Sequence, residues 1–272
     1  MKQKPEVSII ISTYNSVEWL KKTLWGYAYQ DFNDFEIVIA DDGSGAETKE
    51  AIAQLSPLFD RPIIHVWHED IGFRKTTILN KALQACNAEY ILMSDGDCIP
   101  KVNFVQVHLK HKEPGYFLSG GYFKLPLSIS QAITQEDIKK QRCFDLKWLK
   151  AQGLNNSIKN KKLSAGTFES KFLNLVTPTK PTWNGHNASG WKQDILAVNG
   201  FDERMQYGGE DRELGERLFN KGLKSKQIRY SAVCVHLDHA RGYVKEEMLV
   251  KNAAIRKETK LQRKTYTAFG IK

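Results

Sequence analysis

Two carboxylates flank one glycine in the Asp95-Gly96-Asp97 motif. Carboxylate oxygens on such a tight turn can hold Mg2+ or Mn2+, and the metal keeps other positions open for a substrate phosphate. The motif alone is weak evidence, because D-x-D turns also occur as ordinary surface loops. It follows the apolar run Tyr90–Met93, however, and two acids beside a buried strand need a charge partner. The position therefore favours a metal site.

A second acidic motif, Gly208-Gly209-Glu210-Asp211, precedes a stretch with the apolar spacing of an amphipathic helix. Acids at this point would stabilise the positive end of a helix dipole, which is the simplest interpretation. Two glycines followed by two acids exceed what such a cap needs. Glycines let a substrate approach the backbone closely, and an acid here can act as general base on an incoming hydroxyl.

The Asp41-Asp42-Gly43-Ser44 segment has two interpretations. Its residue types are typical of a β-turn stabilised by an aspartate side chain. A carboxylate at the same place can instead accept a hydrogen bond from a uracil N–H or from a ribose hydroxyl. Composition does not decide between the two.

Two histidines, His236 and His239, follow an apolar run that ends at Val235. A histidine at a strand end more often has a structural role than a metal-binding one. Near a D-x-D metal, however, an imidazole is a suitable third ligand. The pattern does not tell which of the two histidines would bind the metal.

These motifs must be positioned by regular elements, and the hydrophobic pattern predicts alternating strands and helices. Strands are expected at Val7–Ser12, Phe35–Ala40, Ile63–Trp67 and Tyr90–Ser94, and helices after Asn15 or Ser16, at Thr48–Phe59 and at Lys75–Cys86. Such alternation predicts an α/β fold with a mainly parallel central sheet flanked by helices on both faces. In sheets of this kind, ligands bind beyond the carboxyl ends of the strands.

The polar motifs fall at those strand ends. Ser12–Asn15 follows the first strand, Asp41–Ser44 follows the second, and Asp95–Asp97 follows the fourth. Because the carboxyl ends of parallel strands meet at one edge of a sheet, we expect the three segments to converge on one crevice.

The second half of the chain is less regular. From Leu125 to Pro181 the pattern weakens and becomes basic, which indicates an insertion or flexible lid rather than sheet. Regular structure returns at Gly190, with a helix expected at about Asp211–Lys221 and a strand at about Ile228–Val235. No stretch rich in serine, glycine and proline divides the 272 residues, so we expect a single domain.

Composition excludes several classes of protein. The hydrophobic share of 41% and the charged share of 26% are ordinary for a globular protein, which excludes disordered and collagen-like chains. No run reaches the roughly 20 apolar residues of a spanning helix, and the first apolar run is too short for a signal peptide, so a cytoplasmic protein is expected. The four cysteines lack metal-ligand spacing, which argues against a cysteine-based zinc site.

A net charge of +9 indicates a polyanionic partner, and nucleic acid, an anionic membrane or a phosphate-bearing small molecule would all fit. Basic residues concentrate at Lys139–Lys162 and Lys251–Lys272, and each group is either a solvated face or a binding surface. In the C-terminal group, basic and apolar residues are mixed. This mixture predicts peripheral contact with the anionic inner face of the cell membrane.

Five segments resemble those of the family 2 glycosyltransferases of the GT-A fold. They are Val7–Asn15, Asp41–Ser44, Asp70–Arg74 together with Asn80, Asp95–Asp97, and Asn199–Asp202 leading to Gly208–Asp211. Each segment alone is modest evidence, whereas five in the family's order and spacing are strong evidence. The resemblance covers most of the chain. It is greatest to the bacterial chondroitin polymerase domains and, in the C-terminal half, to the β-1,4-galactosyltransferases.

The resemblance implies one Rossmann-like GT-A domain and assigns roles within it. Its parts are a nucleotide-binding half at 1–124, a variable insertion or lid at 125–181, an acceptor and catalytic half at 182–240, and a basic C-terminal tail at 241–272. The implied roles are Asp211 as catalytic base, Glu210 at the acceptor or donor sugar, Ser12, Tyr14, Asp42, Arg74, Asp95 and Asn187 at the nucleotide sugar, and Asp97 and His236 at the metal. Nothing in 125–181 matches, so acceptor specificity stays open.

The implied activity is that of an inverting, metal-dependent hexosyltransferase. It would move a hexose or N-acetylhexosamine from a UDP-sugar to a glycan or lipid-linked acceptor in bacterial surface polysaccharide or lipo-oligosaccharide synthesis, with Mn2+ or Mg2+ as cofactor. Two alternatives remain. A sugar nucleotidyltransferase would need a glycine-rich basic loop after the first strand, and Ser12–Asn15 is not such a loop. A non-catalytic basic module would not need the acidic motifs, and no nucleic-acid-binding signature is present.

Overall fold

A central sheet of seven strands organises the protein. The computed structural model describes residues 3–240 and 244–271. In spatial order the strands are β3 (Ile64–Trp67), β2 (Phe35–Asp41), β1 (Val7–Thr13), β4 (Tyr90–Asp95), β8 (Ala188–Trp191), β6 (Tyr116–Ser119) and β9 (Lys224–Gln227). Within this sheet only β8 runs antiparallel to its neighbours, so the sheet is mainly parallel, as the alternating pattern predicts.

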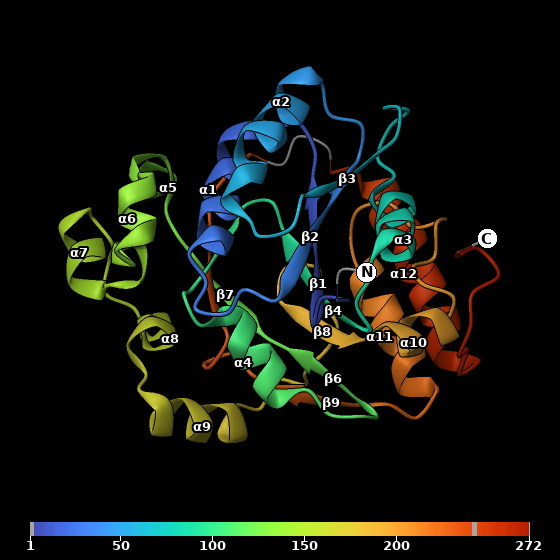
Figure 1. Ribbon diagram of the computed structural model, residues 1–272. Helices are drawn as coiled ribbons and strands as arrows, with labels where there is room; N and C mark the ends of the chain where they lie inside the picture. The colour runs from blue at the N-terminus through green and yellow to red at the C-terminus, as the bar shows by residue number, and fades with distance from the viewer. Residues whose placement is uncertain (1–2, 241–243, 272) are drawn as a thin grey trace.

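Helices cover both faces of this sheet (Figure 1). One face is covered by α1 (Val17–Ala28), α2 (Ala46–Leu55) and α4 (Phe104–His111), and the other by α3 (Lys75–Ala85), α10 (Lys192–Ala197) and α11 (Glu210–Asn220). Successive strand residues point to opposite faces, so Ile9 and Ile11 of β1 pack in the first layer and Ile10 in the second. Burial on both faces explains why the strands are apolar throughout rather than alternating.

A smaller sheet of three strands lies at the end of β4. It consists of β5 (Cys98–Pro100), β10 (Val233–His236) and β7 (Gly121–Lys124), with β10 antiparallel to β5 and parallel to β7. The expectation of one strand over Ile228–Val235 is therefore wrong. The chain leaves β9 at Gln227, turns where the Ala232 N–H donates to the Ile228 carbonyl, and enters the other sheet. An apolar run alone does not reveal such a change of sheet.

The segment expected as an insertion or lid is helical and carries part of the core. Its helices are α5 (Leu127–Ala132), α6 (Gln135–Lys139), α7 (Leu146–Ala151), α8 (Lys161–Ser164) and α9 (Thr167–Val176), which Figure 1 shows in green to yellow beside the sheet. Ile129, Ile138 and Leu149 pack in one cluster with Val235 of β10, and Trp25 of α1 packs against it. Short 3-10 helices lie at Ser56–Leu58, Arg142–Phe144 and Ile158–Asn160. None of the helices in the described part of the chain is long and apolar enough to cross a membrane.

The basic C-terminal segment is folded onto the body of the protein. Of this segment, residues 241–243 and 272 lie outside the described residues. Helix α12 (Glu246–Leu261) packs along α11, with Met248 and Ile255 buried. Beyond it, the Ile271 N–H donates to the Asn199 carbonyl at 3.2 Å. Residues 246–271 are therefore part of the folded domain and do not form an extended tail.

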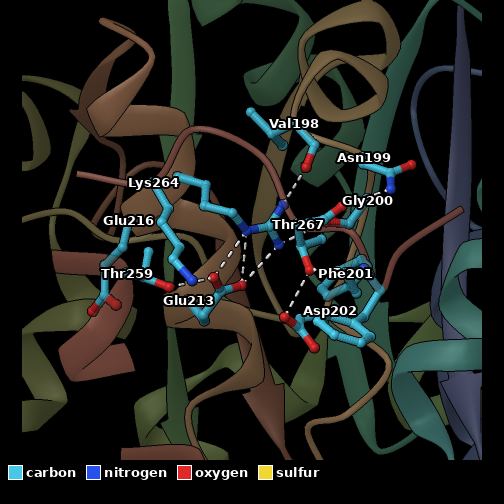
Figure 2. A network of polar contacts seen from close by, with 12 residues as sticks. Val198, Asn199, Gly200, Phe201, Asp202, Glu213, Glu216, Thr259, Lys264 and Thr267 are labelled. Carbon is cyan, nitrogen blue, oxygen red and sulfur yellow. Dashed lines mark hydrogen bonds and ion pairs between the residues drawn. The ribbon is translucent and has the colours of Figure 1, made fainter. Parts of the chain in front are cut away.

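A buried ion pair fixes α11 to the chain before it. The Arg217 guanidinium contacts both carboxylate oxygens of Glu213 at 2.7–2.9 Å, and each side chain is 1% exposed. The same guanidinium donates to the carbonyls of Val198 and Gly200, and Thr259 of α12 donates to Glu213. Figure 2 shows Glu213 between Thr259 on one side and the Val198 and Gly200 backbone on the other. This network positions the helix that carries the second acidic motif.

Candidate active site

The strand ends do converge on one cavity. It has a volume of about 1470 Å3 and lies between the ends of β1, β2 and β4 and the helices α11 and α12. Small-molecule sites are usually about 300–1,000 Å3, so this cavity has room for more than one ligand. Eight of the ten residues to which the resemblance gives roles line it: Ser12, Tyr14, Asp42, Asp95, Asp97, Glu210, Asp211 and His236.

Asp95 lies at the end of β4, against the end of β1. Its Oδ1 accepts hydrogen bonds from Ser12 Oγ at 2.7 Å and from Lys75 Nζ at 2.9 Å. The next residue approaches β1 so closely that a Cβ on Gly96 would lie 2.9 Å from the Ser12 carbonyl oxygen. Burial alone would raise the pKa of Asp95, but the Lys75 charge and the hydrogen bonds from Lys75 and Ser12 act in the opposite direction, and that pKa lies well below its usual range. Asp95 is thus a fixed carboxylate.

Lys75 is a site residue that the sequence analysis missed. It begins α3 and lines the cavity among Asp95, Asp211 and Glu210. Burial alone would lower the pKa of Lys75, but these three carboxylates outweigh burial and raise it well above its usual value. A cation in the first turn of a helix opposes the helix dipole. That mismatch is the signal that could have identified Lys75 as the partner of an acid.

Asp97 lies one residue further along, beside both candidate histidines. Its Oδ2 is 3.4 Å from His236 Nε2 and 2.9 Å from His239 Nε2. Ligand atoms of Asp97, Cys98 and His236 all lie within 4.8 Å of one another. A carboxylate with imidazole suits Mn2+ better than Mg2+, because Mg2+ prefers a shell made of oxygen alone. The residues present therefore fit a manganese-type site, and either histidine can reach it.

Two aromatic residues that were not predicted complete this corner of the cavity. The ring of Tyr122 on β7 lies 4.8 Å from the His186 ring and 5.0 Å from the His236 ring, centroid to centroid. Burial lowers the pKa of His186 to about 4, although the Asp95 charge acts in the opposite direction. His186 is therefore neutral near pH 7. His186 lies outside the helices and strands, and Tyr122 lies on β7, a short strand that the hydrophobic pattern did not predict.

The two aspartates after β2 have different surroundings: one stabilises the turn and the other faces the cavity. Asp41 is fully buried, and its Oδ1 accepts from the Ser44 N–H at 2.8 Å, which is the turn interpretation. Asp42 lines the cavity, held by His68 at 2.7 Å and by the Arg74 N–H at 3.0 Å. Only Asp42 is therefore placed to meet a ligand.

The two acids of the second acidic motif also differ: Glu210 stabilises the turn, whereas Asp211 does not. Gly208 and Gly209 have φ of 106° and 88°, in the region where a side chain would be strained, so the double glycine is required by the turn itself. Glu210 Oε2 accepts from the Gly208 N–H at 2.9 Å and stabilises that turn. Asp211 is free of this task. Its Oδ1 has no hydrogen-bond partner among the described residues, although little solvent reaches it.

The surroundings of Asp211 make it basic. Burial and the neighbouring Glu210 raise the pKa of Asp211 to about 7, against the opposing charge of Lys75. Gly185 lies across from it, so close that a Cβ there would be 3.0 Å from Asp211 Oδ2. On the other side, Asn252 of α12 donates to the carbonyls of residues 206, 207 and 208 at 3.0–3.1 Å and fixes the approach to the turn. A carboxyl with this pKa can exchange protons near neutral pH.

Two predicted residues do not line the cavity. The Arg74 guanidinium donates to the Glu69 carbonyl, and only the Arg74 backbone N–H reaches Asp42. Asn187 is fully buried, and its Nδ2 donates to the carbonyls of Gly121 and Ala232 at 2.8 and 3.0 Å. This placement does not support direct contact of either side chain with a nucleotide sugar, because neither residue lines the cavity.

Two family models match the chain. Residues 8–124 match the model described as glycosyl transferase family 2, and residues 179–240 match the model described as the N-terminal domain of galactosyltransferase. Over residues 8–124, the chain is similar to glycosyl transferase family 2. The second match contains His186, Glu210, Asp211 and His236, so the two matches together contain most of the residues that line the cavity. Lys162 and the lining residues from Lys245 onward lie outside both matches.

Curated relatives of this chain are glycosyltransferases. It is 28% identical over 243 residues to validoxylamine A glucosyltransferase of Streptomyces hygroscopicus subsp. jinggangensis, covering 84% of this chain and 54% of the relative. It is 24% identical over 241 residues to chondroitin synthase of Escherichia coli, covering 82% and 33% respectively. The chain thus spans about half or less of these relatives. The second match confirms the resemblance to the chondroitin polymerases.

A solved structure agrees on the fold. The crystal structure of GalNAc-T7 with UDP, GalNAc and Mn2+ superposes with a TM-score of 0.63 at 13% identity, covering 95% of this chain and 48% of that one. At this identity the likeness concerns the fold alone. The prediction of an α/β GT-A fold with a mainly parallel sheet flanked by helices is confirmed.

Proposed function

We propose that this protein is an inverting glycosyltransferase that moves a hexose or N-acetylhexosamine from a UDP-sugar to an acceptor hydroxyl. One observation carries the proposal: the Asp211 carboxyl lines the same cavity as the Asp97 and histidine cluster, with an unpartnered oxygen and a pKa of about 7. A base and a metal-type site facing one cavity are what direct displacement requires. The family 2 and galactosyltransferase matches support this chemistry.

The donor would lie along the strand ends. Ser12, Tyr14 and Asp42 face the part of the cavity proposed for the nucleoside, and Tyr14 is held there by its bond to Asp70 at 2.7 Å. Asp95 and Asp97 would meet the ribose and the diphosphate. UDP and Mn2+ are bound together in GalNAc-T7, which supports the same pairing in this protein. A divalent cation at Asp97 would neutralise charge on the departing diphosphate.

Asp211 would take the proton of the acceptor hydroxyl as its oxygen attacks the anomeric carbon. The ionised base is needed at the moment of attack, and Lys75 favours that form because it lies among Asp95, Asp211 and Glu210. Neutral His186 adds no positive charge to this wall near pH 7. Attack from the Asp211 side, opposite the diphosphate, would invert the anomeric configuration.

The four-part division is kept as a proposal. Residues 1–124 would bind the nucleotide and 182–240 would supply the catalytic acids, while 125–181 would shape the acceptor site in bacterial surface polysaccharide or lipo-oligosaccharide synthesis. Two observations support the last part: Lys162, Thr179 and Lys180 line the cavity, and no part of 125–178 is covered by either family model. The family 2 relatives include an enzyme of Campylobacter jejuni named for a lipid-linked undecaprenol acceptor, which supports the acceptor class.

UDP binding tests the proposal directly. We expect EDTA to weaken the affinity for UDP by at least about tenfold, because the diphosphate cannot approach Asp95 and Asp97 without a cation between them. Calorimetric titration of UDP with Mn2+, with Mg2+ and with EDTA measures this. Asp97→Asn should weaken UDP binding in Mn2+ in the same way, whereas the exposed Asp60→Asn should not. Equal affinity for UDP with and without EDTA would contradict the proposed metal site. Binding of a short oligonucleotide in place of UDP would contradict the proposed enzymatic function.

We propose membrane contact separately, and we favour helix α9 over the C-terminal segment for it. Helix α9 presents an unpaired apolar face, on which Phe168, Phe172 and Leu175 are 87%, 62% and 83% exposed. Residues 155–180 contain five lysines and one acid. An exposed helix with apolar residues on one side and lysines around it suits the surface of an anionic membrane. Only part of α12 is available for such contact, because its inner face packs on α11.

Sedimentation with vesicles distinguishes the two surfaces. We expect the double variant Phe168→Ser with Phe172→Ser to lose most of its binding to phosphatidylglycerol vesicles, because it removes the exposed apolar face of α9. The matched variant Lys251→Gln with Lys257→Gln, on the exposed side of α12, should bind nearly as well as the unchanged protein. The opposite order would return the contact to the C-terminal segment. Equal binding by all forms would contradict both.

A further inference from the structure

Two basic side chains meet on the cavity wall that β7 forms. Lys162 comes from α8 and Arg229 from the turn after β9, and both line the cavity. Lys162 Nζ donates to the Tyr122 carbonyl at 2.8 Å. Arg229 Nη1 donates to Thr179 Oγ1 at 3.3 Å. The pair thus adjoins the β7 residue whose ring faces His186 and His236.

These cations have no acid to balance them. Among the described residues, neither Lys162 nor Arg229 forms an ion pair with a carboxylate, and the buried Arg229 Nε has no hydrogen-bond partner. Burial, followed by repulsion from Arg229, lowers the pKa of the Lys162 amino group. Two partly enclosed like charges without a counter-charge are unfavourable. A ligand that brings negative charge would relieve this cost.

The backbone is shaped to let Arg229 lie there. A Cβ on Gly121 would be 2.8 Å from Arg229 Cγ and 3.2 Å from Arg229 Nε. These atoms belong to the root and middle of the side chain, which cannot turn aside as a flexible end can. Glycine at position 121 therefore holds open the place that the guanidinium occupies, beside a carbonyl that Asn187 fixes.

We propose that Lys162 and Arg229 form an anion subsite that binds a phosphate or carboxylate group of a substrate, separate from the UDP diphosphate. The inference rests on the proposed function, which places the diphosphate at Asp97. The cavity exceeds the usual size of a single-ligand site, and its acidic residues lie at the strand ends and on α11 rather than beside this pair. The anion is carried either by an acidic donor sugar or by the acceptor.

Two binding experiments distinguish these sources. In the first, the affinities for UDP-glucuronate and UDP-glucose are compared in Mn2+, because the two differ by one carboxylate on the sugar. In the second, inorganic sulfate, as a stand-in for a phosphate group, is titrated into protein saturated with UDP and Mn2+. Each is done with the unchanged protein, with Lys162→Met, with Arg229→Met, and with Gly121→Ala, which keeps both charges but displaces the guanidinium. Lys150→Met, exposed on α7 and outside the cavity, is the control for net charge.

We expect one of the two probes to lose about tenfold or more in affinity in both methionine variants, which is the usual effect of losing a charge-assisted hydrogen bond. Gly121→Ala should lose affinity in the same experiment, and Lys150→Met should not. Loss of UDP-glucuronate affinity assigns the anion to the donor sugar, and loss of sulfate binding assigns it to the acceptor.

The affinity for UDP itself should stay within about twofold in these variants. If UDP weakens as much as the probes, the pair holds the diphosphate and the inference is overturned. It is also overturned if neither probe responds. Failure of the unchanged protein to bind UDP would instead count against the proposed function.

Discussion

Asp211→Asn should slow sugar transfer by about 100-fold or more, with little change in UDP affinity in Mn2+. A general base acts on the acceptor only in the chemical step, and its loss typically costs about 100- to 10,000-fold. Asparagine keeps the shape of the side chain beside Gly185 but cannot accept the proton. Initial rates with a donor and acceptor, together with UDP titration, measure both quantities. Glu210→Gln is the comparison, because Glu210 already serves the Gly208 turn.

The pH dependence gives a second measurement of the same residue. The ionised carboxylate is the active form, so kcat/KM should rise with pH through the pKa of Asp211, which is about 7 without metal. A bound divalent cation favours the carboxylate and moves this midpoint lower. In Asp211→Asn the rise should disappear. A profile that keeps its acidic limb would assign the base to another group, with Glu210 the next candidate.

Stability separates a catalytic Asp211 from a structural one. Its pKa is raised on folding from 3.8 to about 7, so ionisation is disfavoured in the folded state. The cost therefore grows between about pH 4 and pH 7 and is fully present above pH 7. Asp211→Asn should consequently unfold at the same or a higher temperature at pH 8. A clear loss of stability there would show that the carboxylate holds the turn.

Arg217→Met should lower the free energy of unfolding by about 3–5 kcal/mol, the usual cost of leaving one partner of a buried ion pair alone. Glu213 would keep only its bond to Thr259 in a buried site, and the carbonyls of Val198 and Gly200 would lose their donor. Urea unfolding followed by circular dichroism measures the change. Arg212→Met, an exposed neighbour on the same helix, should change stability by less than about 1 kcal/mol.

We expect removal of both charges of the Arg217–Glu213 pair to lower the free energy of unfolding less than removal of Arg217 alone. Replacing both members, as Arg217→Met with Glu213→Leu, should recover much of the loss, because no uncompensated charge remains buried. A single variant that costs under about 1 kcal/mol would mean that water reaches the site. A double variant as unstable as the single one would mean that the bonds to the Val198 and Gly200 carbonyls dominate.

The first half of the fold was predictable from sequence because its elements are buried in a simple way. Strands packed on both faces give continuous apolar runs, and predicted Val7–Ser12 differs from β1 by one residue. Helix 48–59 was predicted too long, since the chain tightens into a 3-10 turn at Ser56–Leu58 where Pro57 cannot donate a hydrogen bond. The change of sheet at residues 228–232 and the helical core of 125–181 depend on long-range packing, which local patterns do not record.

The candidate site was predictable where a residue type is required by backbone geometry or by the end of a strand. The double glycine before Asp211, and Asp42, Asp95 and Asp97 at the cavity, are of this kind. Lys75 and His186 were missed because a lone lysine or histidine has many ordinary uses. Asn187 differs from both: its role stays a prediction from its family position, whereas its side chain is fully buried and donates to the carbonyls of Gly121 and Ala232.

The bonds from Asn252 to the carbonyls of residues 206–208 have a consequence for protein engineering. The turn that aims Asp211 is held by a residue more than forty positions later in the sequence. Exchange of residues 182–240 alone with those of a relative would therefore separate the donor of these bonds from its acceptors. Hybrid enzymes should carry 205–211 and 246–261 from one parent, as a single inherited unit. In a library that varies the two segments independently, we expect Asp211 to be wrongly positioned in most variants.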